Sequence, residues 1–253
     1  VGETTFKVEN GIYSITKLTE NQEITVDLKP IGVTVNGVDI NAMSGVGWTY
    51  DSGTQTLTLN RSGLNLSGTN DQDLAPDLKI VTTEMVGSLT LESLKVTSAS
   101  SETLLSLAAD TIITANGNSI LKNSVKARSV YAAQDLTFRG NGSLEVEGFS
   151  NASAPTVETD RNLTLLGTME LIIKSNRSVG KTNIGLVTHD LTIGADGIET
   201  VSPVLRVSAD SNSKSGYAVS ADNVTIYGGE ASFTGTNEET YGLIFQGNVD
   251  CYG

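Results

Sequence analysis

The stretch Asp135-Leu136-Thr137-Phe138 decides the fold, because the chain repeats its pattern at intervals of 25 to 33 residues. The pattern is Asp or Asn, an apolar residue, usually Thr, and a second apolar residue. Asp77-Leu78-Lys79-Ile80 is a looser copy. Closer copies are Asp110-Thr111-Ile112-Ile113, Asn162-Leu163-Thr164-Leu165, Asp190-Leu191-Thr192-Ile193 and Asn223-Val224-Thr225-Ile226. Self-similarity at this period is the signature of a repeat architecture.

Each repeat contains two further alternating segments. Ser143-Leu144-Glu145-Val146 follows a Gly-containing turn, and Ser129-Val130-Tyr131-Ala132 precedes the next copy of the phrase. Three short strands in roughly 25–30 residues predict one coil of a parallel β-helix, because stacked coils about 4.8 Å apart bury a common core. Glu102 to Asp110 also has the composition of a helix, but the repeat predicts a strand there. The expected fold is all-β, a single-stranded parallel β-helix.

The N-terminal part of the chain lacks the repeat. Asn10-Gly11 and Asn36-Gly37 each lie between alternating residues, which is a signal for a two-residue hairpin turn. The end of a parallel stack needs a cover, so we expect residues 1–45 to form an antiparallel β-hairpin cap. Residues 46–253 form the β-helix. Its last coil is expected to be incomplete, because Asn248-Val249 opens another copy of the phrase.

Composition excludes several classes of function. The 253 residues carry a net charge of −13 and the pI is about 4.4, which argues against nucleic-acid binding. No apolar run approaches the roughly 18 residues of a membrane span. One Cys allows no internal disulfide, and one His limits His-based chemistry to a single residue.

The run from Val38-Asp39-Ile40 to Trp48-Thr49-Tyr50-Asp51, followed by Thr56-Leu57-Thr58-Leu59-Asn60, resembles the opening of β-helix domains in surface proteins of gut bacteria. The resemblance covers about residues 38–253. Such domains often carry a provisional carbohydrate-binding or adhesin label. The resemblance implies a right-handed helix, export, and an extracellular or cell-surface location.

Many right-handed β-helices are polysaccharide lyases or hydrolases, so an enzyme is the first alternative. Glycoside hydrolysis needs two positioned carboxylates, and the paired-Asp and Gly-His-Gly motifs of polygalacturonase-like enzymes are absent from the sequence. His189 next to Asp190 is either an exposed corner residue or a base oriented by a carboxylate. The repeated Asp and Asn residues are either a structural ladder or calcium ligands. We expect no catalytic residue, no metal ion and no cofactor.

Two groups of side chains are candidates for glycan binding. The first is a basic row across two equivalent turns, suited to an acidic polymer, unless these are solvated loop charges. The second is a Tyr row that offers ring faces to sugars, unless these rings pack between coils. The basic row contains Lys122, Lys126, Arg128, Lys174, Arg177 and Lys181, and the Tyr row contains Tyr131, Tyr217 and Tyr241.

The sequence therefore predicts a non-catalytic extracellular module, a stalk or adhesin that binds a host or bacterial polysaccharide. A polysaccharide lyase or hydrolase with an atypical site is one alternative. A passive structural spacer without a ligand is the other.

Overall fold

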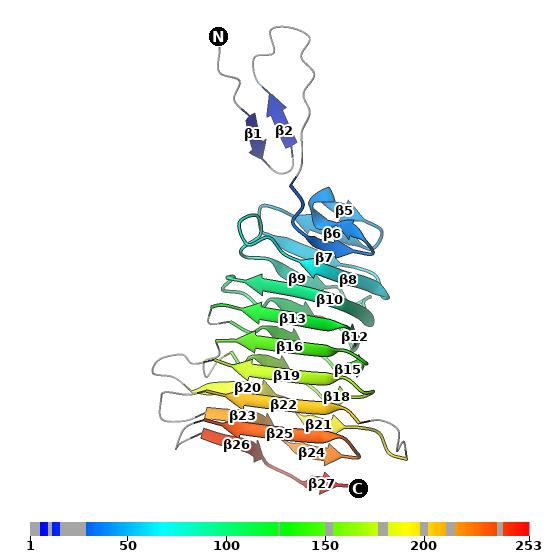
Figure 1. The fold of residues 1–253 in the computed structure, drawn as a ribbon, viewed down its shortest axis with the longest axis vertical. Helices are drawn as coiled ribbons and strands as arrows, with labels where there is room; N and C mark the ends of the chain where they lie inside the picture. Colours follow the sequence, from blue (N-terminus) through cyan, green and yellow to red (C-terminus); the bar gives the residue numbers. More distant parts are fainter. Residues whose placement is uncertain are drawn as a thin grey trace.

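Parallel strands stacked in coils make up most of the molecule (Figure 1). The computed structural model describes residues 6–9, 12–15, 29–125, 127–149, 154–176, 182–197, 202–210, 216–236 and 240–252. Its parallel strands form a β-solenoid of about seven turns. Helix in the described ranges is limited to the short 3-10 turn η1 (Ile40–Ala42). The predicted all-β parallel fold is confirmed.

Three faces run along the solenoid, one for each strand of a full coil. The first face contains β7 (Thr56–Leu59), β9 (Lys79–Thr82), β11 (Leu105–Leu107), β14 (Val130–Ala132), β17 (Val157–Thr159), β20 (Asn183–Val187), β23 (Gly216–Ala221) and β26 (Thr240–Phe245). The second face contains β12 (Thr111–Asn116), β15 (Leu136–Gly140), β18 (Leu163–Leu165), β21 (Asp190–Ile193), β24 (Asn223–Ile226) and β27 (Val249–Cys251). The third face contains β13 (Asn118–Asn123), β16 (Ser143–Gly148), β19 (Glu170–Ser175), β22 (Val204–Ala209) and β25 (Glu230–Gly235).

The core consists of in-register columns of apolar side chains inside the coils. Leu136, Leu163 and Leu191 form one such column, and Phe138 lies beside Leu165 in the next. All five side chains are fully buried. The residues that alternate with them point outward, as the period of two in a strand requires. The repeated phrase therefore buries the same two positions in each coil from that of Asp110 to that of Asp190.

The Asp and Asn residues of the phrase form a ladder of hydrogen bonds at the corner before the second face. The backbone N–H of Asp135 donates to Asp110 Oδ1 at 3.1 Å. Asn162 Nδ2 donates to Asp135 Oδ1 at 3.2 Å, and Asn162 Oδ1 accepts from the backbone of Asp190 at 3.3 Å. Asn223 Nδ2 continues the ladder to Asp190 Oδ1 at 2.8 Å. These bonds support the structural interpretation of the ladder.

One coil departs from the predicted alignment. The looser copy that begins at Asp77 leads into β9 on the first face, where Ile80 pairs with Leu105 and Leu57. Its assignment to the repeated phrase is therefore wrong. The phrase position in that coil belongs to β10 (Ser88–Ser98), an 11-residue strand that pairs first with β12 and then with β13. β10 and β8 (Leu64–Thr69) pair with each other around this corner of the solenoid.

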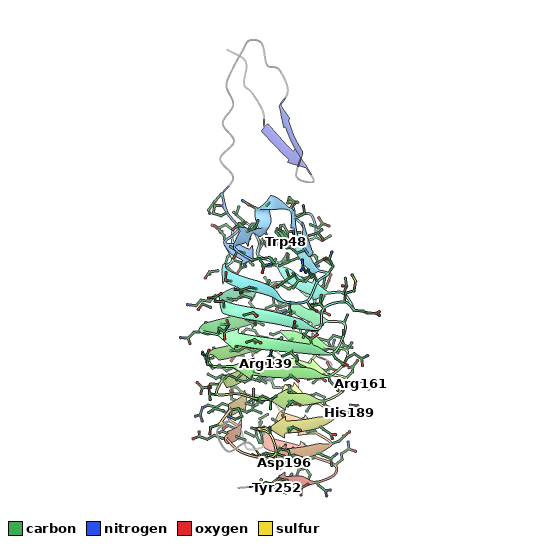
Figure 2. The ribbon with its side chains drawn as sticks, turned by 90° about the vertical axis from the view of Figure 1, so that its right-hand side faces the viewer. Trp48, Arg139, Arg161, His189, Asp196 and Tyr252 are labelled. Atoms are coloured by element: carbon green, nitrogen blue, oxygen red, sulfur yellow. The ribbon has the colours of Figure 1, made fainter. Side chains whose placement is uncertain are left out.

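Antiparallel strands cover the N-terminal end of the stack. β3 (Val33–Val35) pairs with β4 (Val38–Asp39) and with β8, and β6 (Trp48–Asp51) pairs with β5 (Ser44–Gly45) and with β7. Antiparallel pairing thus continues to Asp51, six residues past the expected boundary at residue 45. Figure 2 shows Trp48 in this covering layer, where it is 2% exposed. The pair β1 (Phe6–Glu9) and β2 (Ile12–Ile15) forms an antiparallel sheet of its own, while the Asn10-Gly11 turn lies outside the described residues.

Candidate functional site

Arg128 and Tyr131 lie together at the first face. Tyr131 is in β14, and Arg128 lies just before this strand. The Arg128 guanidinium is 5.1 Å from the centre of the Tyr131 ring and forms an ion pair with Glu158 of the next coil. The Tyr131 hydroxyl donates to Asp160 Oδ2 at 2.5 Å. We call these four residues the Tyr131 cluster. Its members hold one another in fixed positions, because each contacts a charged or aromatic neighbour.

The hydrogen bond to Asp160 raises the pKa of Tyr131 above its usual value, and partial burial acts in the same direction. The phenol therefore remains a proton donor over the physiological pH range. Its partner, Asp160 Oδ2, accepts the hydrogen bond from this hydroxyl. The pair thus has a defined donor and a defined acceptor.

Two shallow grooves meet the Tyr131 cluster on either side along the solenoid. The first groove encloses about 400 Å³ and the second about 410 Å³. Arg128 lines the first groove, and its partner Glu158 lines the second, so the cluster lies between them. The first groove is also lined by Lys79, Ser101, Glu102, Thr103 and Ser106, and the second by Asp160, Thr188, His189, Ser220 and Asp222.

The second groove contains a row of titratable side chains from three successive coils. The pairing of β17, β20 and β23 stacks Asp160, His189 and Asp222 at the end of the first face. His189 Nδ1 and Asp222 Oδ2 are 2.8 Å apart, and the two side chains are 63% and 44% exposed. The carbonyl of Arg161 accepts the backbone N–H of His189 at 2.8 Å. Figure 2 shows Arg161 and His189 one above the other at this edge.

Sequence reasoning named His189 but did not identify the carboxylate that contacts it. The adjacent residue Asp190 belongs to the Asp and Asn ladder, where it accepts a hydrogen bond from Asn223. The actual partner is Asp222, one coil further along the chain. The repeat contained this signal. When Asp190 is aligned with Asn223, the residues just before them, His189 and Asp222, occupy the same column in successive coils.

The described part of the basic row carries alternating charge. Lys122, Glu147 and Lys174 follow one another in register on the third face. Lys122 Nζ lies 2.8 Å from Glu147, and Lys174 Nζ lies 2.7 Å from Glu145. The row is therefore neutralised by glutamates of the coil between its two turns. Lys126, Arg177 and Lys181 lie outside the described residues.

The Tyr row falls into two separate columns. Tyr217 pairs in register with Tyr241 of the next coil, and their rings stack with centroids 6.2 Å apart. Tyr131 lies in another column, next to Glu158. Tyr227 and Tyr252 form a further stacked pair, with ring centroids 5.2 Å apart, that the sequence argument did not name.

No protein-family model, curated protein or solved structure matches the chain. Across the described residues, no group of three or more His, Cys, Asp and Glu side chains has the arrangement to hold a metal ion. The same part of the chain contains no helix of the length and apolarity that a membrane crossing requires.

Proposed function

We propose that this chain is an extracellular or cell-surface module that binds a glycan along its first face. The observation that carries the proposal is the Tyr131 cluster, which joins two open polar grooves on one face of a rigid stack. Export and surface display rest on the resemblance of residues 38–253 to surface β-helices.

The lining of the grooves suits the hydroxyl groups of a sugar chain. Serine and threonine residues, one guanidinium, one ammonium and several carboxylates line the grooves and supply hydrogen-bonding groups. The cluster is already ordered by its internal contacts, so a ligand does not bear the entropy cost of ordering those side chains. From β7 to β26 the face crosses eight strands, or about 34 Å at 4.8 Å for each of seven steps. This length accommodates an oligosaccharide.

Charge favours a neutral glycan over an acidic one. The net charge of −13 repels polyanions at long range. The described lysines of the basic row, Lys122 and Lys174, are each paired with a glutamate, and Arg128 is paired with Glu158. The acidic-polymer interpretation therefore has little support in the described residues.

A glycan array with the purified chain tests this proposal. Tyr131→Ala is expected to weaken binding to any array hit at least tenfold, because it removes the ring and releases both Arg128 and Asp160. Lys174→Ala, which breaks an ion pair on the third face, is the matched control and should bind as the parent does. A blank array favours the passive spacer. Equal loss in both variants, with both folded by circular dichroism, would remove the site from the first face.

A further inference from the structure

The two ends of the solenoid differ in how their strands and core are covered. At the N-terminal end, antiparallel strands lie over the stack. At the C-terminal end, β25, β26 and β27 are the last strands of the three faces, and in the described residues each of them pairs on one side only (Figure 1). A strand edge with unpaired backbone N–H and C=O groups can pair with another chain. The C-terminal end is therefore open to further strand pairing.

The apolar columns of the core are exposed at the same end. Ala221 and Val224 face the core and are 4% and 1% exposed. Their partners in the next coil, Phe245 and Val249, are 47% and 41% exposed. Half of the exposed large apolar side chains in the described part of the chain lie within residues 241–252. The end thus combines a free strand edge with an apolar surface.

We propose that this end binds the same end of a second copy of the chain, so that two solenoids join around a twofold axis. The N-terminal end does not offer a matching surface, because its antiparallel strands already cover the core. Two C-terminal ends each supply the strand edge and the apolar surface that the other lacks. Such an interface uses the same patch on both copies and closes at two.

The pattern of β26 permits pairing with itself. This strand continues the register of β23, whose side chains point in, out, in, in, out and in. The order reads the same from both ends. Antiparallel pairing of two β26 strands about their midpoint therefore places Gly242 opposite Leu243 on the inside and Tyr241 opposite Ile244 on the outside. The inner and outer surfaces of the two copies become continuous.

The other two faces match in the same arrangement. A twofold axis through the midpoint of β26 exchanges them, so that β25 of one copy lies over β27 of the other. Phe233 of β25 then comes toward Val249 and Cys251 of β27. All three continue inward columns of their own coils. The two apolar cores therefore join into one.

The size and charge of the end indicate a weak association. Because β25 and β26 are each about 20 Å long, one end covers on the order of 500 Å², and two copies bury about 1,000 Å² in total. This area is at the lower limit of a specific interface. Each copy also has a net charge of −13, which opposes association until salt screens it. We expect a Kd of about 1–100 μM that falls as salt is raised.

The dimer also bears on glycan binding. Its axis passes through the first face, so the first faces of the two copies form one continuous surface. β14 lies four strand steps from β26, which puts the two Tyr131 clusters nine steps, or about 43 Å, apart. A long glycan that contacts both clusters binds with higher avidity. This consequence rests on the proposed function, whereas the dimer does not.

Sedimentation velocity of the purified chain across this concentration range, at low and high salt, tests the dimer. Phe245→Lys and Val249→Lys should each weaken it at least tenfold, because each places an ammonium group against the joined core. Lysine also lowers the net negative charge, so repulsion cannot explain the loss. Met85→Lys makes the same charge change at a side chain that is 69% exposed. This matched control should dimerise as the parent does.

A second measurement needs no variant. Cys251 is the only cysteine of the chain, and it is free and exposed. Its reaction with a soluble thiol reagent should slow at least fivefold as the protein concentration rises through the Kd, because the second copy covers it.

Each outcome decides the proposal. A slowed reaction of Cys251 together with a dimer twice as long as the monomer in small-angle X-ray scattering supports it. A monomer at every concentration overturns the second copy as the occupant of this end. A dimer that persists in both folded Lys variants, or a constant reaction rate of Cys251, overturns this end as the interface. Species larger than two copies overturn the closed arrangement. A blank glycan array overturns only the gain in avidity.

Discussion

The regular coils and the antiparallel cover at the N-terminal end bury apolar side chains in different ways. In the coils, like residues stack in register, as Leu136, Leu163 and Leu191 do, and any one coil repeats the chemistry of its neighbours. In the cover, Trp48 and Tyr50 are not part of a repeated column, and they pack across the end of the stack. The comparison teaches that periodic residues specify the coils, whereas unrepeated residues specify where the stack begins.

The largest test of this difference is Trp48→Ala. Removal of this buried ring should lower the free energy of unfolding by about 3–5 kcal/mol, and it should also cause self-association, because the edge of β7 and the core lose their cover. Urea denaturation and light scattering measure the two effects. Thr49→Ala, at an exposed position of the same strand, should change stability by less than about 0.5 kcal/mol. Destabilisation without self-association would show that β6 does not act as a cover.

A second test compares two glycines, one in a coil corner and one near the cover. Gly140 has φ of 134°, and an added Cβ would lie 2.1 Å from the carbonyl oxygen of Ala115 in the coil before it. Gly140→Ala should cost about 2–4 kcal/mol from strain and overpacking. Gly63 also has positive φ, at 76°, but an added Cβ meets no atom within 4 Å. Gly63→Ala should cost only about 1 kcal/mol. Equal costs would mean that close stacking of the corners is not what excludes side chains there.

The period of the sequence was sufficient to predict the three-stranded coils, and it correctly gave a strand, β11, within Glu102 to Asp110. It failed in the coil of β10, where the turn between two faces has no glycine and is made instead by Ser93 with φ of 51°. An Asp at 77 then resembled the phrase by chance. A local pattern cannot reveal such an exception, because register is set by pairing with the neighbouring coils.

The candidate site was only partly predictable for a related reason. Arg128 and Tyr131 were named because their residue types suit sugars. Glu158, Asp160 and Asp222 were not named, because they reach the site from other coils, 29 to 33 residues from their partners. Contacts between coils depend on the exact length of each turn, which the repeat varies.

Alkaline pH offers a third test, specific to the cover. Burial raises the pKa of Tyr50 to about 12, and the charge of Asp51 adds to the effect. Between pH 10 and 12 the unfolded chain ionises at this tyrosine while the folded chain does not, so the free energy of unfolding should fall by about 2–3 kcal/mol. In Tyr50→Phe, the free energy of unfolding should not show this part of the fall. Urea denaturation at pH 9 and 11.5 measures the difference. If the free energy of unfolding falls equally with pH in the parent and in Tyr50→Phe, the Tyr50 hydroxyl is hydrated in the folded state.

The smallest effect tests the corner ladder of the coils. Asn162→Ala removes one hydrogen bond to Asp135 and one from the backbone of Asp190, and should cost about 1 kcal/mol because the site is partly hydrated. Asn162→Asp keeps the acceptor for Asp190 but places a third carboxylate between two others. Its cost should therefore shrink as salt is raised from 0.05 to about 1 M, whereas the cost of Asn162→Ala should not change. If salt leaves the Asp variant unaffected, the ladder is a set of independent turns, and the coils are held in register by their apolar columns alone.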